Sequence, residues 1–557
     1  MVEPANSALN LRPLSALMLM GCLALVACGG GGGAPSAPVQ QPVASNPTNG
    51  GTNSGNGNSG NGVNPADFPN SDLYKNYCGA PRTSTAEEFF PDLAGRFEDE
   101  AYWLRSWSYE TYLWYDEIIF SDPEDITPSA EGVAQYFDSL VTPEFTPAGN
   151  PKDRFHYAQD TAQYEARSQQ GITYGYGARY RLVRPTPPRE LVISQVEAGS
   201  PAAAAGLVRG TRIVTVDGED LILGSDVDTL NNGLFPNQPG EAHQLGILNP
   251  GEAAAQTVTL TSAQITENPV PLTTVITTNS GNVGYLLFNS HILTAEQKLV
   301  DAINQFNAQN ITDLVVDIRY NGGGYLYLAN QLAYMVAGAG VAGQTFSALE
   351  FNDKNPGINP VTGEVVAPTR FYTTTFEASP SGRALPTLNL PQQRVFVLTT
   401  SSTCSASEAF INGLRGVGVE VIQIGTTTCG KPYGFYPQDN CGTTYFTTQF
   451  RSVNAQGFGD YPDGFSPANA SASALGVSLP GCQVADDYSP LGAVAEPLLA
   501  AALAYRQDPS SCSTQPSTGA QNPISSDPDL PAAPAEATGA AMIFPRIELT
   551  DMLLRGE

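Results

Sequence analysis

The sequence predicts a multidomain α/β protein, and three changes of pattern along the chain indicate it. Aromatic and aliphatic residues recur at helical spacing within 97–119. Short β-like runs then occupy 171–265, and strand and helix patterns alternate through 281–505. Such alternation is typical of parallel strands joined by right-handed helical crossovers. We therefore expect a helical N-terminal region, a β-rich module and an α/β core.

The first 28 residues have the pattern of an export signal. Residues 13–27 form an apolar stretch of signal-peptide length, which is too short to cross a bilayer comfortably. The stretch ends in Leu-Val-Ala-Cys at Cys28, which resembles a bacterial lipobox. That resemblance implies cleavage before Cys28 and lipidation of its side chain. The alternative is an ordinary signal peptide that is cut nearby.

Residues 29–66 favour the lipoprotein interpretation. They consist almost entirely of Gly, Ser, Asn, Pro, Ala and Thr, which is the composition of a flexible tether, and a tether suits a chain with one anchored end. Gly29, rather than Asp, follows the cysteine, so the resemblance implies the outer membrane. We expect a protein of the bacterial cell envelope that is attached by lipid and faces the periplasm.

Charge and residue usage exclude some classes of partner. The formal net charge is −28, and such a surface repels the phosphates of nucleic acids. The plain interpretation of that charge is a solvated acidic surface. The chain has only 3 His and no C-x-x-C pair, which argues against a zinc site. No cofactor is expected.

The cysteines are expected to pair, because export leads to an oxidising compartment. The chain has 8 Cys, of which one leaves with the signal and Cys28 is taken by lipid. Proximity suggests the pairs Cys429–Cys441 and Cys482–Cys512, although sequence alone leaves the other pairings open.

The expected boundaries follow from these patterns. In chain order they are the signal peptide 1–28, the tether 29–66, the helical N-terminal region 67–170, the β-rich module 171–265, the core 266–512 and a Pro/Ala/Ser-rich tail 513–557 that is predicted to be disordered. In the N-terminal region, further helices are expected near 132–140 and 159–168. Strands of the module are expected at Thr173–Leu182, Leu191–Gln195, Arg212–Val216 and Thr257–Thr261. In the core, strands are expected at Val283–Asn289, Leu314–Arg319, Arg394–Thr399 and Val419–Ile424, and helices at Ala295–Asn307, Tyr325–Ala337 and Ser405–Leu414.

Within the module, residues 196–221 resemble a PDZ domain. The order Gly-Ser-Pro-Ala, Ala-Gly-Leu, Gly-x-x-Ile and Val-x-Gly matches that fold's core helix and following strands. Upstream, Tyr174, Gly175, Tyr176 and Gly177 stand where a PDZ domain has its carboxylate-binding loop. Backbone N–H groups of a Gly-rich turn can hold a C-terminal carboxylate, and the peptide then adds as a strand. The alternative is a generic β-rich module.

A candidate nucleophile opens a predicted helix of the core. Ser405 begins the sequence Ser-Ala-Ser-Glu shortly after a buried strand. The positive end of a helix and its free N–H groups stabilise an anion there. The structural alternative is an N-cap serine whose capping-box partner is Glu408. No His follows His291 and no G-x-S-x-G elbow is present, so nothing indicates a Ser-His-Asp triad.

A candidate base follows the next strand. Lys431 stands between Gly430 and Pro432, which is not the setting of an ordinary solvated helix lysine. Burial disfavours an ammonium, so a buried lysine can carry a neutral amine that accepts a proton. Lysine replaces histidine as a general base in this way. The alternative is a surface lysine.

The third segment is a glycine loop at the end of a predicted strand. Residues 317–324 read Asp-Ile-Arg-Tyr-Asn-Gly-Gly-Gly. Glycines at a strand end allow unusual backbone angles and a close approach of a ligand. Their N–H groups could form half of an oxyanion hole. A phosphate-binding turn is the alternative, but no G-x-x-x-x-G-K-[ST] motif is present.

Together the three segments resemble the C-terminal processing (tail-specific) protease family. Its members show Asp-x-Arg-x-Asn-x-Gly-Gly, then Ser-Ala-Ser-Glu, then Gly-Lys, usually after a PDZ domain, and the resemblance covers about 95–505. It implies a core of the ββα-superhelix type. It also implies the following roles: Ser405 as nucleophile, Lys431 as general base, backbone N–H groups of Ala406 and Gly323 as oxyanion donors with Gly322 as the other candidate, and Asp317, Arg319 and Glu408 as structural residues near the site.

The sequence departs from the family pattern near the lysine. Many members have Gln four residues after it, where this chain has Phe435, and Gln438 lies nearby in a different register. The Ser–Lys spacing is also one residue longer than expected. Because Cys404 and Cys429 adjoin the two candidate catalytic residues, a disulfide between them could brace the site.

The function predicted from these features is that of a serine endopeptidase acting on exported proteins. The PDZ-like module would recognise the C-termini of protein or peptide substrates or control access to the site. One alternative is a non-catalytic PDZ-containing adaptor of the envelope with the same fold. The other is a hydrolase of a different ester or amide, including a carbohydrate ester, which the peptide-recognising module disfavours.

Overall fold

The computed structural model describes most of the chain after residue 67. The described residues are 68–86, 88–236, 238–376, 382–471 and 475–512, together with the backbone of 552–553. The expected signal peptide, Cys28, the tether and all but two residues of the tail lie outside the described residues, so those expectations stay predictions. Among the described residues, no helix is long and apolar enough to cross a membrane.

A six-stranded mixed sheet forms the centre of the core. Its order is β12 (Leu272–Thr278), β13 (Gly281–Leu287), β14 (Ile311–Asp317), β18 (Arg394–Thr399), β19 (Glu420–Gly425) and β26 (Gly481–Gln483). The edge strand β12 runs antiparallel to β13, and the other neighbours are parallel. The inner strands are nearly continuous Val, Ile and Leu runs because both faces of the sheet are covered.

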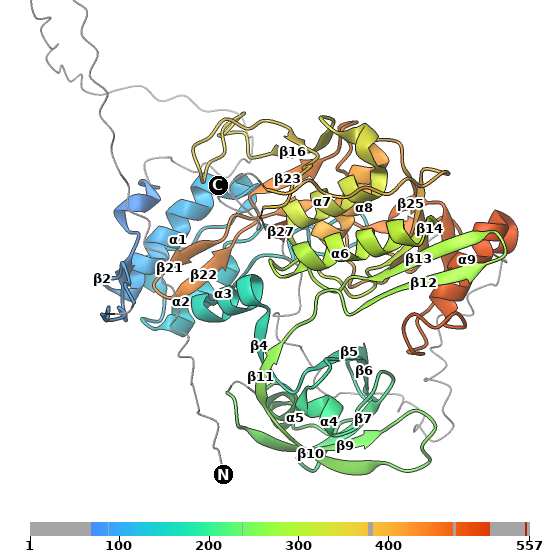
Figure 1. Ribbon diagram of the computed structural model, residues 1–557. Coiled ribbons are helices and arrows are strands. Elements are labelled where there is room, and N and C mark those ends of the chain that lie inside the picture. The colour runs from blue at the N-terminus through green and yellow to red at the C-terminus, as the bar shows by residue number, and fades with distance from the viewer. Residues whose placement is uncertain are drawn as a thin grey trace, which may run out of the picture. The chain divides into compact units, whose positions relative to one another are not determined.

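Helices cover the two faces of this sheet. Alternate strand residues, such as Leu286 and Val316, pack in one cluster with α6 (Ala295–Ala308), α7 (Leu326–Ala337) and α8 (Ala406–Gly416). The intervening residues pack in a second cluster with α9 (Pro497–Gln507). Figure 1 shows α6, α7 and α8 together along one side of β13 and β14. The predicted α/β character of the core is confirmed.

The N-terminal region contains several helices and shares a sheet with the core. Its elements are β1 (Tyr77–Cys78), β2 (Leu93–Ala94), α1 (Phe97–Thr111), α2 (Ala130–Ser139), β3 (Tyr157–Asp160) and α3 (Thr161–Gln170). Trp103 and Trp107 of α1 stack with ring centres 5.1 Å apart and anchor an aromatic cluster that includes Tyr445. Strand β3 also pairs with β22 (Thr443–Phe446) of the core, so the N-terminal region contributes a strand to a sheet of the core.

The β-rich module has a hydrophobic core of its own. Its elements are β4 (Ile172–Gly175), β5 (Ala178–Arg184), β6 (Glu190–Val196), α4 (Pro201–Ala204), β7 (Arg212–Val216), β8 (Glu219–Asp220), α5 (Val227–Leu234), β9 (Ala242–Leu248), β10 (Gln256–Thr261) and β11 (Ala263–Thr266). The sheet order β10-β9-β7-β6-β5 leaves β5 at one edge.

Short strands complete the core around the main sheet. They are β15 (Gly324–Tyr325), β16 (Thr345–Glu350), β17 (Thr369–Arg370), β20 (Tyr433–Gly434), β21 (Gln438–Asn440), β22 (Thr443–Phe446), β23 (Phe450–Val453), β24 (Phe465–Pro467), β25 (Val477–Leu479) and β27 (Met552–Leu553). Strands β17-β16-β23-β20 form one further sheet, and β21-β22-β3 form another.

Most predicted elements are present, and three of them differ clearly in extent. The helix that begins at Phe97 ends at Thr111 rather than continuing to residue 119. The run 173–182 is two strands, because Gly175 and Gly177 take φ angles of 146° and 74° that break the ladder. The strand expected at 314–319 is β14, which ends at Asp317. The sequence analysis also did not identify β9 or α5.

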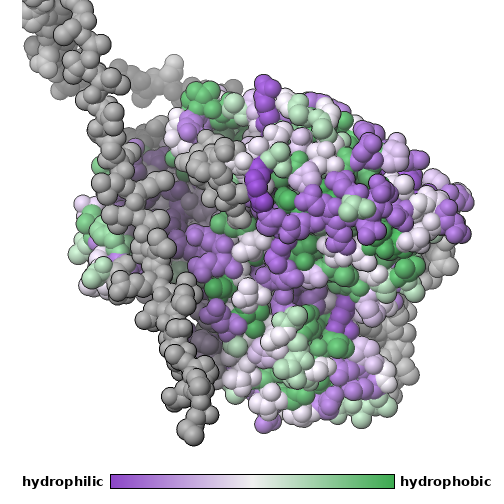
Figure 2. Space-filling model, in the orientation of Figure 1, coloured by the Kyte–Doolittle hydropathy of each residue, from purple (hydrophilic) through white to green (hydrophobic). Residues whose placement is uncertain are grey.

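The surface visible in Figure 2 is a mixture of hydrophilic and hydrophobic residues. In Figure 2 hydrophilic residues are spread over the face turned to the viewer, with smaller hydrophobic patches between them.

Candidate active site

Ser405 lies at the N-terminus of α8, directly after the loop that follows β18. Its backbone takes φ 59° and ψ −116°, a conformation that a non-glycine residue adopts only where its surroundings impose it. Its side chain is fully buried, and its Oγ has no hydrogen-bond partner in the structure. An unpartnered serine hydroxyl at a helix N-terminus has the setting of a nucleophile, while the Ser405 backbone N–H donates to Glu408, as in the capping box of the alternative interpretation.

Glu408 connects the segment of Ser405 with the segment of Lys431. Its buried carboxylate accepts the backbone N–H groups of Ser405 at 3.0 Å, Gly430 at 2.8 Å and Lys431 at 2.8 Å, and the Thr428 hydroxyl at 2.5 Å. Burial raises the pKa of the Glu408 carboxyl, although these hydrogen bonds oppose the rise. The structural role expected for Glu408 therefore extends to both candidate catalytic segments.

Lys431 is fully buried, so it is not the surface lysine of the alternative interpretation. It follows Gly430, whose φ of +84° turns the chain after β19. Its Nζ lies 3.9 Å from the centre of the Phe435 ring and 5.0 Å from that of Phe155. Phe435, which replaces the Gln of many family members, therefore contacts the lysine. Gln438 instead accepts a hydrogen bond from Lys75 at 3.3 Å.

A disulfide joins the two segments covalently. Cys404 and Cys429, which adjoin the candidate nucleophile and base segments, are bonded with Cα atoms 5.2 Å apart. The expected brace is therefore present.

The other two disulfides test the pairings suggested by proximity. The predicted pair Cys482–Cys512 is confirmed. The predicted pair Cys429–Cys441 is wrong, because Cys441 bonds Cys78 across a separation of 363 residues. The fold brings the N-terminal region next to β21 and β22. This proximity in space could not be inferred from the spacing of the cysteines in the sequence.

The glycine loop lies beside the start of α8. The carbonyl of Asn321 accepts the backbone N–H of Cys404 at 3.1 Å and the Ser407 hydroxyl at 3.0 Å. Gly323 has a φ of 111°, and its N–H donates to the Asn321 side chain at 3.0 Å. The loop and the N-terminus of α8 are thus in direct contact, as an oxyanion hole formed by Ala406 and a loop glycine requires.

His291 and Asn321 form hydrogen bonds that stabilise the glycine loop. The sequence analysis did not assign either residue to the site. The Asn321 Oδ1 atom accepts from Nδ1–H of His291 at 3.0 Å, and the His291 backbone N–H donates to the Gly323 carbonyl at 2.9 Å. Burial lowers the pKa of His291 to about 4, so its ring is neutral above that pH. The one available signal was the Asn inside the Asp-x-Arg-x-Asn motif.

Asp317 and Arg319 form the base of the glycine loop, as expected. Arg319 is fully buried and pairs with Asp317 and Glu496, both at 2.8 Å, and with Asp486 at 3.2 Å. Burial by itself would lower the pKa of Arg319, but the three carboxylates outweigh it and hold the pKa well above its usual value. The network fixes the end of β14, from which the loop departs.

The β-rich module reaches this network through Arg209. The Arg209 guanidinium pairs with Asp486 at 2.5 Å and donates to the Ser489 carbonyl at 2.8 Å. From the edge strand β5, Arg181 donates to the hydroxyls of Ser401 and Ser402, both at 2.8 Å, just before the candidate nucleophile. The module therefore contacts both the support of the glycine loop and the approach to α8.

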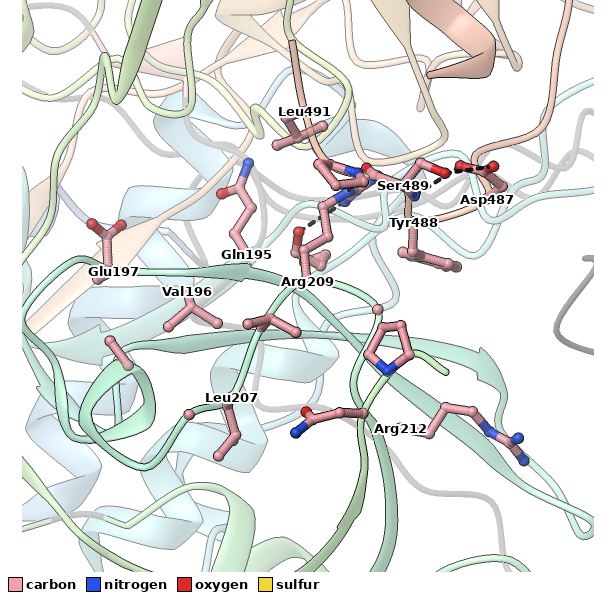
Figure 3. Close-up of a pocket in the computed structure, with 18 of the residues that line it drawn as sticks. Gln195, Val196, Glu197, Leu207, Arg209, Arg212, Asp487, Tyr488, Ser489 and Leu491 are labelled. Carbon is pink, nitrogen blue, oxygen red and sulfur yellow. Dashed lines mark hydrogen bonds between the residues drawn. The ribbon is translucent and has the colours of Figure 1, made fainter. Parts of the chain in front are cut away.

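A cavity of about 1180 Å³ lies next to these contacts, lined by the module and by core residues that include Pro271, Leu287, Asn289 and 487–491. Figure 3 shows Arg209 with a hydrogen bond to Ser489, and Gln195 and Leu207 on the module side. Neither Ser405 nor Lys431 lines the cavity. It is therefore a feature of the module–core boundary rather than of the candidate active site.

The Gly-rich segment expected to form a carboxylate-binding loop is only partly a loop. Tyr174 and Gly175 belong to strand β4, whereas Tyr176 and Gly177 form the turn before β5. The buried Tyr176 hydroxyl donates to the Gly233 carbonyl of α5 at 2.9 Å. The turn thus lies at the end of the edge strand β5 and next to α5.

The fold and the site together define a mixed α/β protein with a buried serine at a helix N-terminus and a buried lysine joined to it through one carboxylate and one disulfide. Residues 282–439 match the model of peptidase family S41. Through this segment the chain is similar to peptidase family S41, which agrees with the resemblance to the C-terminal processing proteases.

Individual proteins agree with this assignment. The chain is 30% identical over 141 residues to the carboxyl-terminal-processing protease of Picosynechococcus sp. (strain PCC 7002), a match that covers 24% of this chain and 32% of that protein. It is 31% identical over 168 residues to the chloroplastic C-terminal processing peptidase of Tetradesmus obliquus, covering 27% and 34%. The chain thus spans about a third of the length of these curated relatives.

A solved structure shares the fold more widely. An S41 protease structure from Bacteroides fragilis NCTC 9343 superposes with a TM-score of 0.53 at 24% identity, over 75% of this chain and 98% of that one.

Proposed function

We propose that this protein is a serine endopeptidase in which Ser405 is the nucleophile and Lys431 the general base. The observation that carries the proposal is the Glu408 carboxylate, which binds the backbone of both residues and so fixes their segments together. The match of residues 282–439 to the model of peptidase family S41 supports peptide-bond hydrolysis as the reaction class.

In this mechanism Ser405 attacks the peptide carbonyl and its proton passes to Lys431. Lys431 is buried next to Phe155 and Phe435, which places its amine in a site closed to solvent. The protonated lysine then gives its proton to the leaving amine, and water releases the acyl-enzyme by the reverse steps.

The oxyanion of the tetrahedral intermediate would be held by two backbone N–H groups. One belongs to Ala406 in the first turn of α8, where the helix dipole adds to the hydrogen bond. The other belongs to the glycine loop. The Gly323 N–H already donates to the Asn321 side chain, so it would have to break that hydrogen bond before it could bind the oxyanion. The Gly322 N–H is the other candidate donor.

The β-rich module would serve as a PDZ domain that recognises C-terminal segments of substrates or controls access to the site. The turn at Tyr176 and Gly177 lies at the end of the edge strand β5, the position for a peptide to add as a strand. Arg209 and Arg181 provide the physical route from the module to the catalytic segments.

We place the protein at the bacterial cell envelope, anchored through a lipid on Cys28 in the outer membrane and facing the periplasm. Its substrates are then exported proteins. Substituting Cys28→Ala should move the protein from the membrane fraction to the soluble fraction, and retention in the membrane fraction would contradict the anchor.

Two substitutions test the catalytic assignment. Ser405→Ala and Lys431→Met should each lower cleavage of an unstructured protein on the order of 10³-fold or more, while the exposed-residue control Lys298→Ala keeps wild-type activity. Circular dichroism checks that all three variants fold. Unchanged cleavage by Ser405→Ala would remove the nucleophile assignment, and absence of cleavage by the wild type would favour the non-catalytic adaptor.

A further inference from the structure

A strand from near the end of the chain lies beside the candidate active site. Strand β27 pairs in parallel with β15, with Met552 opposite Gly324 and Leu553 opposite Tyr325. It also adjoins β20, at Tyr433 and Gly434. In Figure 1 β27 is labelled in the middle of the core, beside β23 and α7.

The two strands that β27 adjoins are continuations of the catalytic segments. Strand β15 begins directly after the candidate oxyanion donor Gly323, and β20 begins two residues after Lys431. His291 already occupies one side of β15, because its carbonyl accepts the Tyr325 N–H at 2.8 Å. β27 also pairs with β15, through backbone pairing of Gly324 with Met552 and of Tyr325 with Leu553.

An extended peptide that adds to a strand edge is a general mode of peptide recognition. A peptide substrate must also lie extended next to the oxyanion donors, because its scissile carbonyl has to reach them. β27 therefore has the position and the backbone conformation that a bound substrate requires. The burial of Ser405 and Lys431 is consistent with an occupied site, since a substrate cannot reach a fully buried nucleophile.

The sequence of the tail suits such a ligand. Its first part, residues 513–540, is rich in Pro, Ala and Ser, whereas apolar residues gather after it. The apolar residues are Met542, Ile543, Phe544, Ile547, Leu549, Met552, Leu553 and Leu554. A connection over 513–551 spans on the order of 130 Å when extended, so it reaches any part of the core. Tethering also gives an effective concentration on the order of millimolar, so that even weak affinity leads to occupancy.

We propose that the segment around Met552 and Leu553 is an intramolecular ligand of the catalytic groove: it adds as a strand to β15 and competes with peptide substrates. The proposal rests on the proposed function, since the groove is a substrate site only if Ser405 is the nucleophile. It assigns a role to the tail and defines the edge of β15 as the surface that receives an extended peptide.

The first experiment compares the full chain with a chain truncated after residue 540. Removing a competing ligand should lower KM for an unstructured substrate several-fold with little change of kcat. The double substitution Met552→Pro/Leu553→Pro should have the same effect, because proline lacks the N–H that pairs a strand. Ala535→Pro is the matched control, since it adds proline to the same tail outside β27, and it should leave KM unchanged.

The second experiment measures binding without catalysis. A labelled synthetic peptide of residues 542–557 is titrated into Ser405→Ala protein by fluorescence anisotropy. The truncated variant should bind it at least several-fold more tightly than the full-length variant, in which the tethered segment competes. The peptide with prolines at 552 and 553 should bind neither form.

The outcomes separate the two proposals. If cleavage depends on Ser405 but truncation leaves KM unchanged and the peptide does not bind, the tail inference is overturned and the proposed function stands. If the peptide binds the truncated Ser405→Ala form but no variant cleaves protein, the groove and its ligand stand and the proposed function fails. Loss of the terminal residues from the purified wild type but not from Ser405→Ala, seen by intact mass, would support entry of the tail into the groove.

Discussion

The carboxylate of Glu408 accepts the backbone N–H of Lys431 at 2.8 Å, and the two residues are 23 positions apart in the chain. The same carboxylate holds the backbone N–H of Ser405. One side chain therefore contributes to the geometry of both segments, beside the adjacent disulfide and the hydrogen bond from the Cys429 N–H to the Thr403 carbonyl.

Replacing this carboxylate should reduce catalysis more than folding. In Glu408→Gln one oxygen becomes an amide that cannot accept, so at least one of the backbone N–H groups loses its partner inside the protein. We expect kcat to fall about 10- to 100-fold at a similar Tm. Activity at the wild-type level would show that Glu408 does not position the site, and the exposed Glu420→Gln is the control.

The disulfide between Cys404 and Cys429 should matter for activity, whereas Cys482–Cys512 should matter for stability. The first links the two candidate catalytic segments, and the second links β26 to the region after α9. The double substitution Cys404→Ala/Cys429→Ala should lower kcat at least 10-fold, and Cys482→Ala/Cys512→Ala should lower Tm at nearly unchanged kcat. Equal effects of both pairs on kcat would contradict this division.

Arg209 should couple the β-rich module to the catalytic core. Burial by itself would raise the pKa of Asp486, but Arg209 and Arg319 outweigh it and the pKa lies below its usual value. Arg209→Ala removes one cation from that shared carboxylate and loosens the module contact. We expect a several-fold loss of kcat/KM and faster limited proteolysis between the module and the core. Arg184→Ala, on the half-exposed face of β5, should change neither measurement.

Glu100 gives a pH dependence of stability that does not involve the active site. Burial raises its pKa from 4.5 to about 7 in the folded protein, although the Gly79 N–H opposes the rise. The folded state therefore binds a proton more tightly than the unfolded state, so stability is lost as the pH rises from 4.5 to 7. Above pH 7 the loss is complete.

Glu100→Gln should remove this loss, which is on the order of 2 kcal/mol in the free energy of unfolding. Urea unfolding at pH 5 and pH 8 measures it: the wild type should lose more stability than Glu100→Gln between the two values. The exposed Glu131→Gln should follow the wild type at both, and parallel behaviour of all three proteins would contradict the assignment.

Sequence patterns predicted the core elements best where they are long and apolar. β18 has the predicted bounds and α8 begins one residue after Ser405, because buried parallel strands and an N-cap serine leave clear local signals. The contacts between segments far apart in the chain were not predictable in the same way. The bond of Cys78 to Cys441, the support of the loop by His291 and the pairing of β27 all depend on how the chain returns on itself.

The disulfide between Cys78 and Cys441 also determines what a single cut does to the molecule. The two cysteines are 363 positions apart, and the segment between them contains the whole β-rich module and helix α8, which begins after Ser405. A nick anywhere in that segment leaves both pieces covalently joined, and they separate on a gel only after reduction. A chain that is cut in an exposed loop of this segment thus still holds Ser405 and the N-terminal region in one covalently joined molecule.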